Sequence, residues 1–278
     1  MLSTSNGDLA ARWTRLRGEQ PTVLLEADAT DPAATANALA ALAEINQLAL
    51  QPDLKGAAAV PPATAPFQLQ IQRRYNPAGI SQYNIVPGLI GVILTMTLML
   101  MTALGITRER ERGTLENLLA LPVRPLEVML GKILPYVLVG YLQVAVILAT
   151  ARYLFAVPYD GSLPLLLACT LLFIVANLAI GITFSSLARN QMQAMQMSFF
   201  FFLPSILLSG FMFPFRGMPG WAQWLGELLP LTHYLRLIRG IVLKGNGWEQ
   251  IAHHLWPMAL FTLLALLLAL ARYRRTLD

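Results

Sequence analysis

Residues 204–245, PSILLSGFMFPFRGMPGWAQWLGELLPLTHYLRLIRGIVLKG, combine apolar, aromatic and helix-breaking residues in one stretch. An apolar run ends at Gly210, and residues 214–220 form a turn rich in Pro and Gly. Pro230 then separates an aromatic segment from a short amphipathic one. Because such breaks are incompatible with one straight spanning helix, we expect a re-entrant helical hairpin over residues 218–244. The rest of the chain is interpreted around this hairpin.

The composition indicates an integral membrane protein. Of 278 residues, 56% are hydrophobic and 13% are charged, whereas soluble domains carry roughly 25% charged residues. The basic residues cluster beside apolar segments, as topology signals do, so we expect no nucleic acid partner. One cysteine, Cys169, excludes a disulfide framework, and the spacing of the three histidines does not indicate a metal site.

Five apolar segments in the second part of the chain are each near the length of roughly 20 residues that crosses a bilayer. They lie at about residues 85–107, 131–155, 163–187, 192–213 and 251–272. The sequence therefore predicts a mainly α-helical polytopic membrane protein, with residues 85–278 as its transmembrane domain.

The distribution of Arg and Lys orients these segments. The loop at residues 108–130 is rich in Arg and is expected in the cytoplasm, as is the Arg-containing C-terminus. The turn at residues 157–162 has no basic residue and is expected outside. This alternation places the hairpin and residues 1–84 on the outer side, with the hairpin's basic residues at its outer rim.

Residues 1–84 hold seven of the fifteen acidic residues in less than a third of the chain and read as a partial extracytoplasmic α/β domain. Strands are expected at about residues 22–27 and 67–72, and a helix is expected from Asp31 as N-cap to about residue 50. Because two strands rarely form a stable sheet alone, we expect the first part of this domain to be missing from the chain.

The cytoplasmic loop carries a short amphipathic helix between helix-breaking residues. Gly113 ends the preceding helix, Thr114 can cap the next one, and Glu116 lies in its first turn. Leu118 and Leu119 share one side of that helix with a preceding leucine. Such a helix suits docking into a partner's groove, but it fits equally well as a membrane-surface helix that completes the loop.

Three stretches together resemble the ABC-2 family of ABC-exporter permeases. These are ERERGTLENLLALPVRPLEVMLGK at residues 109–132, the hairpin stretch at residues 204–245, and RYNPAGISQYNIVPGLIGVILTMT at residues 74–97. The resemblance covers about residues 20–275 and is strongest to the bacterial inner-membrane group with a large periplasmic insert.

The resemblance implies a fold and partners. Family members have six transmembrane helices, so this chain is expected to be N-terminally truncated, with the first helix missing. The family works as a homo- or heterodimer in the bilayer of the bacterial cell inner membrane, with an ABC ATPase subunit on the cytoplasmic face. A periplasmic adaptor protein is a further candidate partner. ATP is used by the ATPase partner, and no cofactor is expected to bind this chain directly.

Two groups of residues are expected to act by position, without a catalytic or metal-binding role. Coupling to the ATPase is assigned to Arg110, Glu111, Arg112, Gly113, Thr114, Glu116, Leu118 and Leu119. The outer gate in the re-entrant hairpin is assigned to Gly210, Pro214, Pro219, Pro230, His233, Tyr234, Arg236, Arg239 and Gly240.

The chain itself has no ATP-binding motif of the form G-x-x-x-x-G-K-[ST]. We therefore expect the permease of an ATP-driven exporter for a hydrophobic or amphipathic substrate. An inactive fragment or a non-transporting scaffold is the main alternative. An ion-coupled carrier is disfavoured because the predicted spans hold essentially no carboxylates between their ends. A proton relay through Glu227 and His233 is the weakest alternative.

Overall fold

The computed structural model describes residues 22–48, 68–113 and 125–275. The chain divides into two compact units, Met1–Ser81 and Gln82–Asp278, and each is described by itself.

The first unit contains two strands and one helix among its described residues. Strands β1 (Thr22–Asp28) and β2 (Gln68–Arg74) pair in parallel, with α2 (Pro32–Leu48) between them in sequence. The Asp31 side chain accepts hydrogen bonds from the backbone N–H groups of Ala33 and Ala34 at 3.1 and 3.2 Å, which satisfies donors that the first helical turn leaves free. The predicted strands, helix and N-cap are confirmed.

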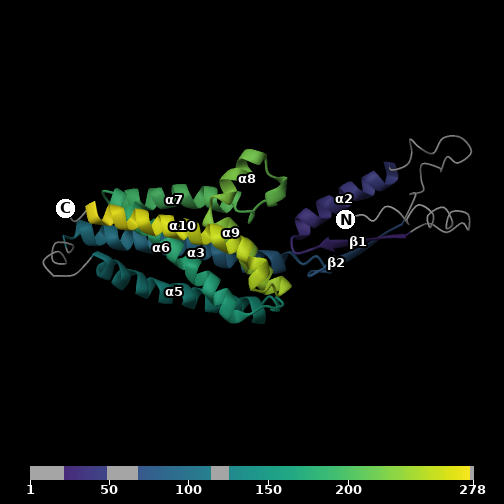
Figure 1. The fold of residues 1–278 in the computed structure, drawn as a ribbon, viewed down its shortest axis with the longest axis horizontal. Helices are drawn as coiled ribbons and strands as arrows, with labels where there is room; N and C mark the ends of the chain where they lie inside the picture. The colour runs from purple at the N-terminus through teal and green to yellow at the C-terminus, as the bar shows by residue number, and fades with distance from the viewer. Residues whose placement is uncertain (1–21, 49–67, 114–124, 276–278) are drawn as a thin grey trace, which may run out of the picture. The chain divides into compact units, whose positions relative to one another are not determined.

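The second unit is an array of long helices (Figure 1). They are α3 (Ser81–Glu111), α5 (Pro125–Tyr153), α6 (Leu163–Leu187), α7 (Gln191–Leu208) and α10 (Trp248–Arg275). The shorter elements η2 (Phe215–Gly217), α8 (Gly220–Glu227) and α9 (Pro230–Lys244) lie between α7 and α10 in the chain. The C-terminal end of α10 and helix α8 are at opposite ends of this array (Figure 1).

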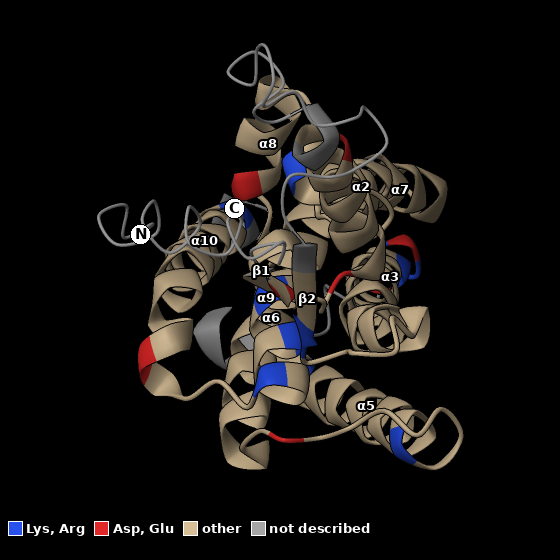
Figure 2. Ribbon diagram, turned by 90° about the vertical axis from the view of Figure 1, so that its right-hand side faces the viewer, with Lys and Arg blue, Asp and Glu red and all other residues tan. Residues whose placement is uncertain are grey.

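Four of these helices are long and apolar enough to cross a membrane: α3, α5, α6 and α10. Helix α6, for example, has 25 residues and extends over roughly 37 Å at the usual rise per residue, against a hydrocarbon core of about 30 Å. Most of the helical ribbon carries neither acidic nor basic residues (Figure 2). Four of the five predicted spans are therefore confirmed as helices of spanning length.

The fourth predicted span, residues 192–213, needs correction at its end. Helix α7 has 18 residues and stops at Leu208, and it is not among the four helices of spanning length and composition found in the described residues. Gly210 adopts a φ of +84°, a left-handed conformation that ends helices and favours glycine. Whether α7 crosses the membrane stays a prediction.

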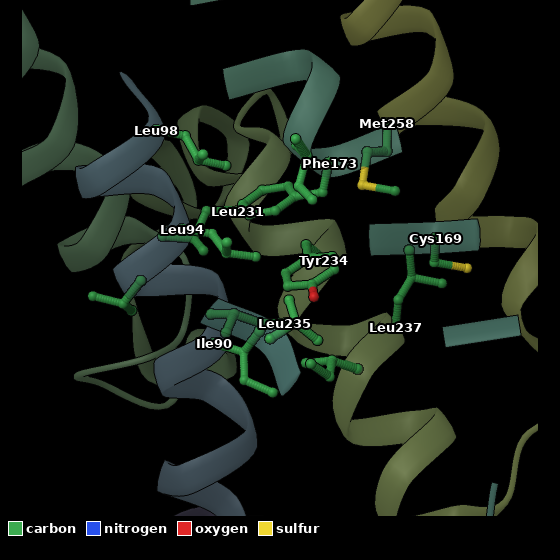
Figure 3. Packing of buried hydrophobic residues seen from close by; sticks show 14 of the residues in the cluster. Ile90, Leu94, Leu98, Cys169, Phe173, Leu231, Tyr234, Leu235, Leu237 and Met258 are labelled. Atoms are coloured by element: carbon green, nitrogen blue, oxygen red, sulfur yellow. The ribbon is translucent and has the colours of Figure 1, made fainter. Parts of the chain in front are cut away.

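Helix α6 lies at the centre of the bundle and packs against α10, α9, α5 and α7. Its buried side chains include Phe173, Ile174 and Leu178. Ile90 and Leu94 of α3 point toward α9 across the core (Figure 3). In a bilayer such contacts stabilise the fold through close packing, because lipid and Leu are equally apolar.

The outward faces of the bundle are strongly apolar. On α5, the leucines Leu134, Leu138 and Leu142 follow one another at helical spacing, and each is more than 60% exposed. A soluble protein rarely exposes apolar surface of this extent, so these faces fit contact with lipid.

Candidate functional site

The predicted coupling residues begin at the C-terminal end of α3, which is hydrogen-bonded to the turn between α6 and α7. The Arg110 guanidinium donates a hydrogen bond to the backbone carbonyl of Ala188 at 3.2 Å. The Glu111 carboxylate accepts a hydrogen bond from the backbone N–H of Gln191 at 2.8 Å, and a second one from the Gln191 side-chain amide. The end of α3 is thereby joined to the first residue of α7.

This joint is reinforced by small buried residues and by a cap. Ala103 of α3, Ala188 of the turn and Ala194 of α7 form a compact buried cluster. The Asn190 side chain accepts a hydrogen bond from the backbone N–H of Gln193 at 2.8 Å and caps α7. Because the three alanines allow close approach of the backbones, α3 and α7 meet here as rigid elements.

The same end of α3 is also joined to α5. The Glu109 carboxylate forms an ion pair with the ammonium group of Lys132. Gly113 has a φ of +71°, and its N–H donates to the Arg110 carbonyl at 3.2 Å, so it follows the end of α3 as predicted. Arg112 is exposed. Four further predicted coupling residues lie outside the described residues: Thr114, Glu116, Leu118 and Leu119.

The predicted hairpin forms two helices with a tight connection. Pro219 immediately precedes α8, and Pro230 is the first residue of α9, a position that proline tolerates because its missing N–H needs no partner there. The hydroxyl of Thr232 donates to the Gly226 carbonyl at 2.6 Å, which satisfies a carbonyl at the end of α8. The helical hairpin is present, and its depth in the membrane stays a prediction.

A charged group fastens α8 to α9. The Arg236 guanidinium donates two hydrogen bonds to the Glu227 carboxylate, at 3.0 and 2.6 Å. It also lies 4.5 Å from the ring centroid of Phe215, a cation–π contact. Partial burial favours a raised pKa for the Glu227 carboxyl, but the hydrogen bonds and charge of Arg236 hold that pKa below its usual value.

His233 is buried at the same junction. Its Nε2 lies 2.8 Å from the backbone oxygen of Glu227. Since a carbonyl only accepts, Nε2 carries the proton and donates. Burial lowers the pKa of this imidazole below its ordinary value, so the neutral form is favoured. A cavity of about 310 Å³ is lined by Glu227, His233, Arg236, His253, His254, Trp256 and Pro257.

Two other predicted gate residues, Tyr234 and Arg239, pack into the helix bundle. Tyr234 is 1% exposed, and its ring stacks on Phe173 with centroids 4.0 Å apart. Arg239 is half-buried and donates to the carbonyls of Asn84 and Gly210, each at 3.3 Å. Arg239 thereby links the start of α3 to the end of α7, and the place of the hairpin's basic residues at an outer rim stays a prediction.

The remaining gate residues shape the backbone. Gly210 carries the left-handed turn after α7, and Pro214 immediately precedes η2. At Gly240, a Cβ atom would lie 2.8 Å from the Asn246 side-chain amide, so a larger residue would displace that side chain. The arrangement of the α3–α7 joint and of the α8–α9 hairpin suits transmission of movement between helices rather than bond-making chemistry.

The contacts between α3 and the α6–α7 turn were not predicted from the sequence. Glu111 and Gln191 are separated by 80 residues, and no local pattern marks such a pair.

Comparison with known proteins places the chain among transporters. A family model described as "ABC-2 family transporter protein" matches residues 6–271. "Probable multidrug ABC transporter permease YbhR" from Escherichia coli (strain K12) is 33% identical over 208 residues, which cover 75% of this chain and 56% of that protein. "Probable multidrug ABC transporter permease YbhS" from the same organism is 36% identical over 181 residues, or 64% of this chain and 48% of that protein.

"Inner membrane transport permease YhhJ" from Escherichia coli (strain K12) is 32% identical over 222 residues, which cover 76% of this chain and 56% of that protein. The chain thus spans about half the length of the curated relatives it matches.

Proposed function

Since this chain belongs to the ABC-2 family of transporter permeases, we propose that it is the membrane-spanning subunit of an ATP-driven exporter. The chain is a multi-pass membrane protein, as its helices and its inner-membrane relatives indicate. The proposed cargo is hydrophobic or amphipathic, in keeping with relatives named as multidrug permeases. ATP would be hydrolysed by a partner subunit, and two permease copies would enclose the path.

The joint between α3 and α7 is the observation that carries this proposal. The ATPase would push on residues 108–130 when it binds ATP. Because Arg110 and Glu111 are hydrogen-bonded to the α6–α7 turn, a displacement of α3 would move the start of α7.

Helix α7 would carry that displacement to the outer end. Beyond Leu208 the chain turns at Gly210, and α7 contacts both α8 and α9. Arg239 binds the Gly210 carbonyl and so connects the end of α7 to α9. The hairpin of α8 and α9 would act as the outer gate, opened or closed through α7.

An ion-coupled carrier receives no support from the buried residues. Neither Asp nor Glu is among the buried side chains of the described residues. Carriers of that class place ionisable groups inside the membrane bundle. Glu227, the acidic member of the alternative proton relay with His233, forms an ion pair with Arg236.

Reconstitution with the cognate ATPase tests the proposal. Uptake of an amphipathic dye into inverted vesicles and ATP hydrolysis are measured together for wild type, Gly113→Pro and Glu116→Ala. We expect both variants to insert normally and to lose transport and stimulated hydrolysis. Arg216→Gln is the control, because Arg216 is exposed at the other end of the bundle. Unchanged transport in both coupling variants would count against the proposal.

A further inference from the structure

An apolar cavity of about 410 Å³ lies where α5 ends and α6 begins, at the end of the bundle that the predicted topology places outside. Its walls come from α3, α5, α6, α9 and residues 157–159. Ile90, Leu148 and Val242 contribute apolar side chains from three of these helices. The cavity is separate from the junction of α8 and α9 and from the joint between α3 and α7.

One polar atom in the wall has no partner. The Tyr159 hydroxyl is buried and has no hydrogen bond within the described part of the chain. Burial raises the pKa of this phenol, so it keeps its proton and can donate. Buried polar groups are nearly always hydrogen-bonded, which points to an acceptor supplied from outside the described residues.

A positively charged side chain lines the same cavity. Arg152, near the C-terminal end of α5, lines it. Arg152 is exposed. No hydrogen bond or ion pair joins its side chain to any other described residue. A guanidinium offers paired donors that match phosphate oxygens, and arginines at helix ends reach toward the headgroup layer of a bilayer.

We propose that this cavity binds one phospholipid of the outer leaflet. The acyl chain lies against Ile90, Leu148 and Val242, the phosphate binds Arg152, and an ester carbonyl accepts the hydrogen bond of Tyr159. The combination of an apolar wall, one donor and one cation matches the three parts of an anionic phospholipid. None of these three features alone would select an anionic phospholipid.

The wall with Tyr159 is firmly held. The N–H of Asp160 donates to the Val242 carbonyl at 3.1 Å, and a Cβ atom on Gly161 would overlap the Ile241 backbone. The segment after α5 is therefore packed tightly on α9. A preformed wall lowers the ordering that binding requires.

Native mass spectrometry of the purified full chain tests this site with phosphatidylglycerol as the probe. We expect wild type to bind one tightly held molecule, and Arg152→Gln and Tyr159→Phe each to weaken binding by about tenfold, the factor that a hydrogen bond of roughly 1.4 kcal/mol represents. Ala149→Phe, which fills the cavity, should abolish binding. Arg216→Gln is the matched control, and diacylglycerol, which lacks the phosphate, should bind weakly to wild type and Arg152→Gln alike.

Equal binding by wild type and all three cavity variants would overturn the proposal. A disulfide between two copies of Leu148→Cys would also overturn it, because a second copy would then cover the cavity. Tyr159→Phe should leave the melting temperature unchanged, since no internal hydrogen bond is lost, so weaker binding cannot be ascribed to misfolding. Binding is measured without the ATPase, and its failure would leave the proposed export function standing.

Discussion

The Glu111 carboxylate at the end of α3 accepts a 2.8 Å hydrogen bond from the backbone N–H of Gln191, the first residue of α7. The first N–H groups of a helix have no partner within it, and a negative charge there is favoured by the helix dipole. Glu111 therefore acts as an external cap for α7. The contact holds the end of one helix against the beginning of another.

We expect Glu111→Ala to reduce transport and stimulated ATP hydrolysis several-fold, because α7 would lose its connection to the segment on which the ATPase pushes. Glu111→Gln should keep part of the activity, since an amide oxygen can still accept one hydrogen bond. Both rates are measured in proteoliposomes at matched permease levels.

Glu249→Ala is the control for this series. Like Glu111, Glu249 is an exposed acidic residue. It lies in the first turn of α10, away from the α3–α7 joint. Loss of activity in Glu249→Ala equal to that in Glu111→Ala would show that a general change in surface charge is responsible.

The close approach of α3 and α9 depends on Gly91. A Cβ atom there would lie 2.9 Å from Leu231 Cδ1 and 3.0 Å from Tyr234 Cδ1. Both side chains are fully buried and have little room to move. We expect Gly91→Ala to destabilise the fold by about 1–3 kcal/mol, the usual cost of overpacking, as measured by thermal unfolding in detergent.

Gly131→Ala is the matched substitution. Gly131 is in α5, and nothing lies within 4 Å of the position of its Cβ. Alanine should be neutral or stabilising there, by up to about 1 kcal/mol, because it favours helix. A loss of stability at Gly131 as large as that at Gly91 would contradict the packing explanation.

Local signals in the sequence were sufficient for most of the fold. Apolar length predicted α3, α5, α6 and α10, and Asp31 and Gly113 were recognised at helix boundaries because their backbone roles are local. The end of the fourth segment was misplaced, because an apolar run continues to Phe213 although the helix has already ended before the left-handed Gly210. Composition alone does not show where a turn begins.

The helical hairpin was predictable from the sequence, but the contacts of its side chains were not. His233, Arg236 and Arg239 were all expected in one hairpin, yet Arg239 turns inward toward Asn84 and Gly210. The ends of α3 and α7 meet only when the whole bundle is packed. Pairs that are joined by tertiary packing leave no spacing pattern in a single chain.

Tyr234 provides a test of the polar contacts in the core. Its hydroxyl lies 2.9 Å from that of Thr170, which is itself bonded to the Leu166 carbonyl at 2.7 Å. Tyr234→Phe keeps the stacking on Phe173 and removes this hydrogen bond, so we expect a loss of about 1 kcal/mol. A double-mutant cycle with Thr170→Val should give a coupling energy of about 0.6–2 kcal/mol. Additive effects would show that the two hydroxyls do not interact.

The junction of α8 and α9 should weaken in mild acid. The pKa of His233 is lowered in the folded chain, chiefly by burial, whereas an unfolded histidine titrates near about 6.5. The unfolded chain therefore binds more protons as the pH falls below that value, which favours unfolding. The stability that neutral His233 provides is fully present above its unfolded pKa and is lost as the pH decreases. The pKa of the Glu227 carboxylate is also lowered, and the stability that this carboxylate provides is lost only at lower pH.

Thermal unfolding at pH 7.5 and pH 5.5 measures this effect. We expect the melting temperature of wild type to be lower at pH 5.5 than at pH 7.5. The decrease should be smaller in His233→Gln. Glutamine does not titrate, and its amide can donate to the Glu227 carbonyl as the imidazole Nε2 does. His253→Gln serves as the control, because His253 is exposed and loses little solvation on folding. An equal decrease in wild type and His233→Gln would mean that other groups cause the acid sensitivity.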